Sequence, residues 1–367
     1  MKLRRPVVGH EHAGVRVVRD RRPASSAPDV SVILLDWSVR ERFHALQWLN
    51  RQTVDRSRFE LLWIELHDRV VTEALDGADV LVTCGQRGLY HKHAGYNVGL
   101  LQARGRIVTV CDSDAVFPPD FIASVAAAFE RPGDDEPRAI VLMHYERRTA
   151  ATYPDGLSRM EDVAAYAWRE LQPNVGACMS VRRVDALRFG GFDEHPAYRG
   201  YVCGPYELGW RLVNAGLPEI WHPEAVTLWH FAHPEPSGHF LQFSLDRWCE
   251  VSAPHVDFHA WKAVEAFSTG RLLPSLEHPG VHAERMQLRS IGTAYERGYA
   301  TMTGSGGFSQ GALWRLRATL WKEPIVKLVR KTWWSTAPWR ETPYFWLIRW
   351  AYRKLKPSHA GAGTERR

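Results

Sequence analysis

Short runs of apolar and β-branched residues alternate with segments of helical periodicity through the first third of the chain. Runs of this kind are typical of buried strands, and they cover residues 30–35, 59–66, 80–83 and 107–111. Apolar positions recur at helical spacing in residues 41–51, 92–103 and 119–130. Strands and helices that alternate in this way predict an α/β fold built on a parallel sheet with right-handed crossovers.

The alternation continues less regularly to about residue 231. Strands are expected at 139–145 and 175–181, with an irregular segment at 149–160 and a short helix at 161–171. A further helix is expected to begin at Gly204-Pro205, because proline suits a first helical position, and to end at Gly216. Residues 219–231 are expected to return as extended chain.

Composition divides the chain into four parts. Residues 1–28 are rich in Arg, Pro and Ser without periodicity and are expected to be a disordered tail. Residues 29–255 hold the strand and helix pattern and are expected to form one large domain. Residues 256–303 are predicted to be a C-terminal helical extension. Residues 304–367 begin with a glycine-rich linker and form a basic, tryptophan-rich tail.

Positive charge is concentrated in that tail. The formal net charge is +6, but residues 312–356 alone hold eleven Lys or Arg against two Glu, a net of +9. Residues 357–367 add +1, which leaves about −4 for the first 311 residues and argues against a nucleic-acid-binding face there. Seven of the 16 tryptophans also fall within 312–356. Trp interleaved with Lys and Arg favours helices in a membrane interface, with a helical pair packed on the domain as the alternative.

The cysteines and the N-terminus bear on location. Five cysteines, odd in number and without a Cys-x-x-Cys pair, indicate free thiols in a reducing compartment and no structural zinc. The basic N-terminus lacks an apolar signal core, and no run approaches the roughly 20 apolar residues that span a bilayer. The sequence therefore predicts a cytoplasmic protein, and its tail predicts peripheral attachment to the inner face of the plasma membrane.

Asp112 and Asp114 stand where the central strand ends. Residues two apart in an extended chain point to the same side, so these carboxylates are expected to converge on one cation beyond the strand. Open α/β sheets bind ligands at this edge, and Asn97 and Gly99 on the preceding helix are expected to approach the same loop. A plain turn is the alternative, because Asp is common in loops. The position between a buried strand and a helix favours a site for a metal ion and a diphosphate.

Further short motifs follow one another in a fixed order over residues 29–233. They are Val30-Ser31-Val32-Ile33-Leu34, Tyr96-Asn97-Val98-Gly99, Ala103-Arg104-Gly105, Asp112-Ser113-Asp114, Phe117-Pro118-Pro119-Asp120-Phe121, Gly190-Gly191-Phe192-Asp193-Glu194, Gly204-Pro205-Tyr206-Glu207-Leu208-Gly209-Trp210-Arg211-Leu212 and Trp229-His230. In this order the chain resembles the inverting glycosyltransferases of family 2. The resemblance implies the GT-A fold, a Rossmann-like, mostly parallel sheet flanked by helices. It also implies an enzyme that moves a sugar from a nucleotide-diphosphate donor, with a UDP-sugar favoured, to a hydroxyl of a glycan, lipid-linked or envelope acceptor.

The resemblance implies a metal site as well. Mg²⁺ or Mn²⁺ held by Asp112 and Asp114 would neutralise the charge that grows on the diphosphate leaving group. His230 is the expected third ligand, because a histidine near this point completes the site in some relatives, and His233 is the second choice. A structural role beside tryptophan is the alternative for His230.

The expected base toward the acceptor hydroxyl is Glu207. Relatives often carry Glu-Asp where this chain has Gly204-Pro205, which leaves Glu207 as the acidic residue of that motif. Asp193 or Glu194 is the alternative. Glu207 also has a purely structural interpretation, since a carboxylate in the first turn of a helix answers the helix dipole.

Donor binding is expected at the ends of the first two strands. In the resembling family these segments stack on the base and place a carboxylate at its hydrogen-bonding edge. Residues 35–38 and 65–68 depart from the usual family sequence, and uridine is the expected base. The donor-binding set is expected to be Asp36, Trp37, Glu65, Asp68, Asn97, Asp112, Ser113 and Asp114.

Two other functions are alternatives to the transfer of a sugar. A nucleotidylyltransferase of similar fold is disfavoured, because no glycine-rich phosphate loop with a basic residue follows the first strand. A catalytically degenerate family member that acts as a membrane-associated scaffold or binding protein is the remaining alternative, and the missing Glu-Asp pair is the reason to keep it.

Overall fold

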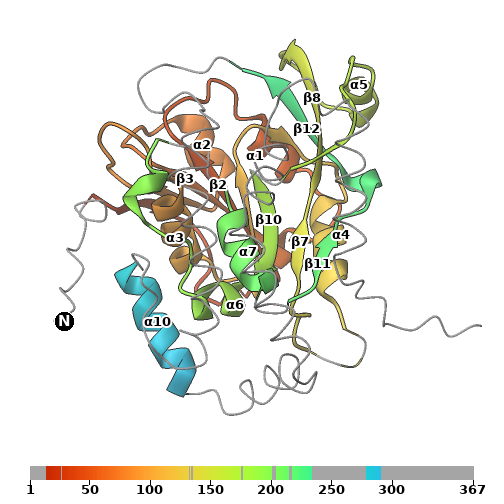
Figure 1. The fold of residues 1–367 in the computed structure, drawn as a ribbon. Helices are drawn as coiled ribbons and strands as arrows, with labels where there is room; N and C mark the ends of the chain where they lie inside the picture. The colour runs from red at the N-terminus through yellow and green to blue at the C-terminus, as the bar shows by residue number, and fades with distance from the viewer. Residues whose placement is uncertain are drawn as a thin grey trace, which may run out of the picture. The chain divides into compact units, whose positions relative to one another are not determined.

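The computed structural model describes residues 14–25, 27–131, 133, 135–174, 177–200, 204–214, 217–233 and 278–290. All of them fall in one of the two compact units into which the chain divides, residues 1–242 together with 256–293. Within this unit a large central sheet lies among helices (Figure 1). The other unit, residues 243–255 and 294–367, lies outside the described residues and includes the predicted basic tail.

The central sheet has eight strands in the order β1-β4-β3-β2-β5-β10-β7-β11. The strands are β1 Arg16–Asp20, β2 Val30–Asp36, β3 Phe59–Glu65, β4 Val80–Thr83, β5 Ile107–Asp112, β7 Val141–Met143, β10 Cys178–Arg182 and β11 Glu219–Trp221. Strands β4, β3, β2 and β5 are parallel, as the alternating pattern predicts, while β10 runs antiparallel between β5 and β7. The expected α/β fold with a mostly parallel sheet is confirmed.

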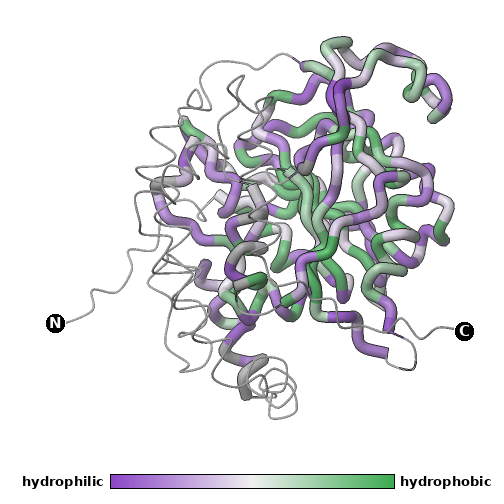
Figure 2. The backbone as a smooth tube through the Cα atoms, turned by 45° about the vertical axis from the view of Figure 1, so that its right-hand side comes forward, coloured by the Kyte–Doolittle hydropathy of each residue, from purple (hydrophilic) through white to green (hydrophobic). Residues whose placement is uncertain are grey.

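Helices cover the central sheet. They are α1 His44–Leu49, α2 Thr72–Gly77, α3 Lys92–Gln102, α4 Phe121–Phe129, α5 Met160–Ala164, α6 Arg183–Arg188, α7 Tyr206–Asn214 and α10 Pro279–Ser290. Figure 2 shows the hydrophobic strands at the centre of this arrangement. Helix α3 lies close on β2 and β3, because a Cβ atom at Gly99 would be 2.4 Å from Ile33 Cγ2. The first turn of α3 is thereby held at the edge of the sheet where the parallel strands end.

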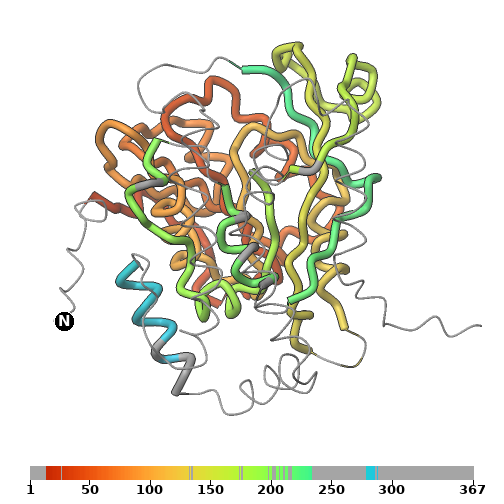
Figure 3. Tube along the Cα trace, in the orientation of Figure 1, coloured from red at the N-terminus to blue at the C-terminus, as the bar shows by residue number. Residues whose placement is uncertain are grey.

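A second sheet stands beside the end of β5. Its order is β6-β12-β8-β9, with β6 Ala115–Val116, β8 Tyr145–Thr152, β9 Gln172–Pro173 and β12 Leu228–Ala232. Strand β6 follows Asp114 directly, and β12 pairs with it so that His230 is opposite Ala115. On its other side β12 runs parallel to β8, with Leu228 opposite Glu146 (Figure 3). Segments far apart in the sequence therefore meet beside the Asp-x-Asp pair.

Two regions differ from the sequence prediction. Residues 16–20 form the edge strand β1, which pairs antiparallel with β4, so the prediction of a disordered tail over 1–28 is wrong there; residues 1–13 lie outside the described part. Strand β8 extends into the segment predicted to be irregular, and the helix predicted at 161–171 is only the short α5. Both strands are rich in polar residues and lack the apolar runs that indicate a buried strand.

The C-terminal predictions are only partly covered by the structure. Helix α10 falls within the predicted helical extension of residues 256–303 and packs against α6 and α3 (Figure 1). The remainder of that extension lies outside the described residues. In the part of the chain that the structure describes, no helix has the length and hydrophobicity needed to cross a bilayer.

Candidate active site at the edge of the central sheet

Three buried carboxylates lie at the edge where the parallel strands end. Asp36 is the last residue of β2, Glu65 of β3 and Asp112 of β5. The strand register places Asp36 beside Glu65, and Leu35 beside Asp112. The three acidic side chains therefore occupy neighbouring positions at the edge where ligands bind in open α/β sheets.

Asp112 is paired with a buried lysine. The Nζ atom of Lys92, at the start of α3, lies 3.0 and 2.8 Å from the two carboxylate oxygens of Asp112. Burial lowers the pKa of Lys92, but Asp112, Tyr90 and Asp114 together outweigh burial and leave that pKa raised, so the ammonium group stays charged. Lys92 was not predicted from the sequence. The available signal was a lysine in the first turn of a helix that begins beside the Asp-x-Asp loop.

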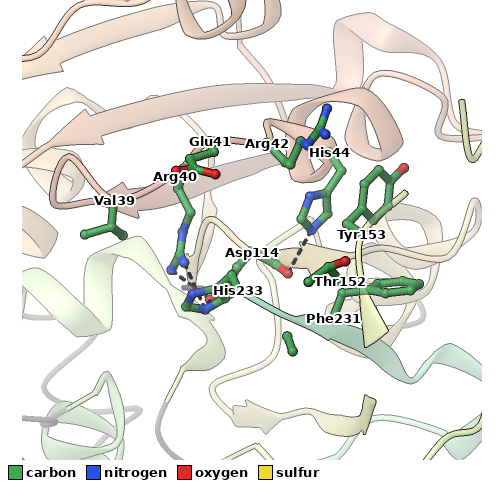
Figure 4. A pocket seen from close by; sticks show the side chains of 11 residues that line it. Val39, Arg40, Glu41, Arg42, His44, Asp114, Thr152, Tyr153, Phe231 and His233 are labelled. Atoms are coloured by element: carbon green, nitrogen blue, oxygen red, sulfur yellow. Dashed lines mark hydrogen bonds and ion pairs between the residues drawn. The ribbon is translucent and has the colours of Figure 1, made fainter. Parts of the chain in front are cut away.

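Asp114 is the centre of a second cluster. Its Oδ2 atom lies 2.7 Å from Arg40 Nη2 and 3.0 Å from His233 Nε2 (Figure 4). The same oxygen is 3.5 Å from His230 Nε2. Burial alone would raise the pKa of Asp114. The positive charge of Arg40, with a contribution from His230, instead holds that pKa well below its usual range, so the carboxylate is ionised.

This cluster has the donor atoms of a metal site. One ligand atom each from Asp114, His230 and His233 lie within 4.8 Å of one another. A carboxylate oxygen and two imidazole nitrogens are ligands that first-row divalent ions accept, so the residues fit a metal ion. Of the predicted set, the structure brings Asp114 and His230 together and adds His233. Asp112 instead faces Lys92.

A buried glutamate stands behind His230. Glu146 on β8 places Oε2 3.8 Å from His230 Nδ1 and accepts hydrogen bonds from Arg148 and Gln172. Burial lowers the pKa of His230, but Asp114 and Glu146 outweigh burial and raise it. Carboxylates in this position orient the ring of a metal-binding histidine. Glu146 was not predicted, because β8 pairs with β12 across a long stretch of sequence.

A cavity of about 250 Å³ opens beside Asp114, and Arg40, His44, Tyr153 and Phe231 contribute to its lining (Figure 4). His44 Nε2 is 2.9 Å from the backbone oxygen of Asp114, and its ring stacks on Tyr153 with centroids 4.1 Å apart. Burial lowers the pKa of His44 to about 4, so this imidazole is neutral at pH 7. The cavity therefore joins a polar edge at Asp114 to an aromatic wall.

Trp37 lies between two cations at the same edge. The guanidinium of Arg40 is 4.8 Å from the centroid of the Trp37 ring and Lys92 Nζ is 4.5 Å from it, while the Tyr90 ring is 5.1 Å away. Ser113 supports this arrangement, because its Oγ accepts a hydrogen bond from Arg40 Nε at 3.1 Å. Trp37 and Ser113 thus stand near Asp112 and Asp114, as the prediction of a donor site requires.

Two other residues of the predicted donor set are engaged elsewhere. Asp36 is fully buried and accepts hydrogen bonds from Arg69 Nη2 at 2.7 Å and from the backbone N–H of Val39 at 3.1 Å, which fixes the turn after β2. Asp68 pairs with Arg87 at 2.8 Å on the surface, where both side chains are largely exposed. The geometry gives Asp36 a part in shaping the site.

Asn97 clamps a loop. Its side-chain amide donates to the backbone oxygen of Phe192 at 2.7 Å and to Glu194 Oε1 at 2.8 Å, and its oxygen accepts the Phe192 N–H at 2.8 Å. Gly191 in that loop has φ +65°, and a Cβ atom there would lie 2.3 Å from Asn97 Oδ1. The contacts of Asn97 therefore shape the loop that carries Asp193 and Glu194, and its contact with the donor stays a prediction.

Glu207 sits in a buried ion pair. Its Oε1 and Oε2 atoms are 2.7 and 2.9 Å from Nε and Nη2 of Arg211, one turn later on α7, and both residues are almost fully buried. Glu207 Oε2 also accepts the backbone N–H of Asp193 at 3.1 Å. The predicted base and its two alternatives therefore belong to one connected cluster.

Glu65 should make stability depend on pH. Burial, together with the neighbouring Asp36, raises the pKa of Glu65 to about 7. A carboxyl group whose pKa is higher in the folded state favours folding below its unfolded pKa, and this contribution is lost as pH rises through 7. Exchange of Glu65 for glutamine should therefore stabilise the protein relative to wild type at pH 8, by up to about 3 kcal/mol, and less as pH falls toward 5.

Urea unfolding of both proteins between pH 5 and 9 would measure this difference. The exposed Glu73→Gln variant on α2 is a matched control and should follow wild type at every pH. A Glu65→Gln curve that stays parallel to wild type across the range would contradict the raised pKa.

Comparison with known proteins places this geometry in context. Residues 72–190 match the family described as glycosyl transferase family 2. None of the curated proteins matches the chain. Among solved structures, the mannosyltransferase PcManGT from Pyrobaculum calidifontis in complex with GDP-Man and Mn²⁺ is 16% identical, covers 86% of each chain and has a TM-score of 0.38. S. aureus TarS 1-349 in complex with UDP-GlcNAc is 12% identical, covers 75% of this chain and 80% of the other, and has a TM-score of 0.41.

Proposed function

Because the match over residues 72–190 identifies a glycosyltransferase of family 2, we propose that this enzyme moves a sugar from a nucleotide-diphosphate donor to an acceptor hydroxyl with inversion, using a divalent metal ion. The observation that carries the proposal is the convergence of Asp114, His230 and His233 beside Asp112, at the edge where the parallel strands end.

Each residue of the cluster has a part in this reaction. When bound, the metal ion would neutralise the charge that develops on the diphosphate as the glycosidic bond breaks. Asp114 stays ionised for this purpose, and Glu146 orients His230. Two imidazoles among three ligands favour Mn²⁺ over Mg²⁺, which prefers oxygen ligands. Lys92 adds a fixed positive charge beside Asp112.

Glu207 is the proposed base, with Asp193 and Glu194 as alternatives. Its carboxylate is held by Nε and Nη2 of Arg211, which fixes its position beside the loop that carries Asp193 and Glu194. The alternatives share the loop that Glu207 and Asn97 hold in place. This arrangement supports a role for the cluster in positioning the acceptor hydroxyl.

The nucleoside is proposed to lie against Trp37, with uridine as the favoured base. The acceptor is proposed to be a hydroxyl of a glycan, a lipid-linked sugar or another envelope component. The basic, tryptophan-rich residues 312–356 support peripheral attachment to an anionic membrane surface on the cytoplasmic side, which would bring the site to such an acceptor. The alternative of a catalytically inactive scaffold would retain the membrane surface without donor turnover.

A thermal-shift panel tests the donor site. The purified full-length protein would be heated with UDP, GDP, dTDP or CMP, each with and without Mn²⁺. A nucleotide at about a hundredfold its Kd should add about 2.7 kcal/mol, which raises the Tm by roughly 5–10 °C for a domain of this size. We expect such a shift for one nucleoside diphosphate, and we expect it to depend on Mn²⁺.

Two controls distinguish binding of the nucleoside, of the diphosphate and of the metal ion. Uridine lacks the diphosphate and should give no metal-dependent shift, while Mn²⁺ without nucleotide reports on the metal site alone. The absence of a shift with every nucleotide would contradict the proposed donor site and favour the scaffold alternative.

A further inference from the structure

Arg40 occupies the corner that the proposed metal ion would need. Its Nη2 atom is 2.7 Å from Asp114 Oδ2, and its Nη1 atom is 3.0 Å from His233 Nε2. The guanidinium therefore contacts two of the three residues that could hold the ion, and Arg40 is only 3% exposed. A divalent cation and a guanidinium cannot both use the single lone pair of His233 Nε2, and the two positive groups repel each other at Asp114 Oδ2.

The contacts at His233 are mutually incompatible. Arg40 Nη1 is a donor and needs an acceptor at His233 Nε2, whereas Asp114 Oδ2, 3.0 Å from the same nitrogen, needs a donor there. A single imidazole nitrogen serves only one of these roles at a time. A metal ion would accept lone pairs from both Nε2 and Oδ2 and so satisfy both groups. The site is thus better completed by a metal ion than by Arg40.

Arg40 is also placed to reach the leaving group. Its Nε atom donates to Ser113 Oγ, and its guanidinium faces the Trp37 ring, which has Lys92 on it as well. The two cations and Trp37 therefore lie together at the proposed donor edge. A diphosphate is a good partner for a displaced guanidinium, because the planar group binds phosphate oxygens in a bidentate manner.

We propose that Arg40 is an internal counter-ion that holds Asp114 and His233 in the ligand-free enzyme and transfers to the donor diphosphate when metal and donor bind. The second half of this inference rests on the proposed function. Metal binding without nucleotide must displace Arg40 and is therefore weak. A diphosphate receives the displaced guanidinium, so metal and nucleotide strengthen each other's binding reciprocally.

Mn²⁺ affinity measured without nucleotide tests the first part of the proposal, that Arg40 holds Asp114 and His233 in the ligand-free enzyme. Free Mn²⁺ is followed by its EPR signal during titration of the full-length protein, a readout that does not depend on activity. Arg40→Gln should bind Mn²⁺ about tenfold more tightly than wild type, within the usual range of coupling between sites. Arg42→Gln is the matched control, because Arg42 is two residues away and pairs with the exposed Asp155; it should bind Mn²⁺ as wild type does.

The second part, that Arg40 moves to the donor diphosphate, is tested by adding the nucleoside diphosphate that gives the largest thermal shift. Arg40→Gln should bind this nucleotide more weakly than wild type, and the gain in Mn²⁺ affinity on adding it should be smaller. Arg40→Lys keeps the charge but loses the bidentate fork, and it should show intermediate Mn²⁺ affinity; it carries the test if Arg40→Gln does not fold.

The outcomes distinguish this inference from the proposed function. If both variants bind Mn²⁺ no more tightly than wild type, the proposed competition between Arg40 and the metal ion is overturned, even when nucleotides bind. If Arg40→Gln gains Mn²⁺ affinity but no nucleoside diphosphate binds either protein, the competition between Arg40 and the metal ion stands. The proposed move of Arg40 to the diphosphate and the proposed donor site are then both overturned.

Discussion

Exchange of Asp114 for asparagine should lower the rate of sugar transfer by about three orders of magnitude and abolish Mn²⁺ binding. Asp114 is the shared contact of Arg40, His230 and His233, and it is ionised. Asparagine keeps the shape but removes the charge that draws a metal ion between the two histidines. The rate would be followed as release of the nucleoside diphosphate, with Mn²⁺ binding measured separately by EPR.

Loss of Asp114 also leaves Arg40 without its carboxylate partner, so folding must be checked by thermal unfolding of the same preparation. Asp155→Asn is the matched control. Asp155 is an exposed aspartate paired with Arg42 near the same cavity, and its exchange should leave the rate unchanged. If Asp114→Asn turns over donor at a rate within tenfold of wild type, the assignment of Asp114 as a metal ligand is contradicted.

Exchange of Arg211 for methionine should destabilise the protein by about 3–5 kcal/mol. The carboxylate of Glu207 would remain buried on α7 without its charged partner, and the backbone oxygens of Phe189 and Gly191 would lose the guanidinium that now contacts both. The loss should appear as an earlier transition in urea. The Gly190–Glu194 loop, which these contacts hold, should become more accessible to hydrogen exchange.

Arg183 provides the comparison for this effect. It pairs with Glu284 at 2.9 Å, but both side chains are partly exposed, so Arg183→Met should cost less than about 1 kcal/mol. Combining Arg211→Met with Glu207→Leu removes the stranded charge and should recover part of the stability. A single Arg211→Met variant as stable as Arg183→Met would show that the buried pair does not hold α7 to the loop.

The sequence predicted the central strands well, because their signal is local. Strands β2, β3 and β5 consist mainly of apolar and β-branched residues, and each is buried along its whole length. Their parallel direction follows from the intervening helices, and the edge that carries Asp112 follows from that direction. The family resemblance drawn from the motifs is confirmed over residues 72–190.

The site was harder to predict, because its partners come from distant segments. Alternate residues of a strand share a face, which led to the expectation that Asp112 and Asp114 converge on one cation. Strand β5 ends at Asp112, however, and a turn intervenes before Asp114, so the two carboxylates face Lys92 and Arg40 respectively. Nothing in the local pattern distinguishes Arg40 from a surface arginine. The pairing of β8 with β12, which places Glu146, is likewise invisible in local sequence.

The pairing of β6 with β12 means that the proposed metal ion would also affect the conformational entropy of the chain. Asp114 and His233 are 119 positions apart, so an ion bound to both would close a long loop as a covalent cross-link does. While the ion stays bound to both residues, closing a loop of that length removes many conformations from the chain. The family-matching segment ends at residue 190, before either histidine, so it contains only one side of this closure. The proposed metal site therefore requires the assembled fold, because the segment that matches the family contains only one of its three residues.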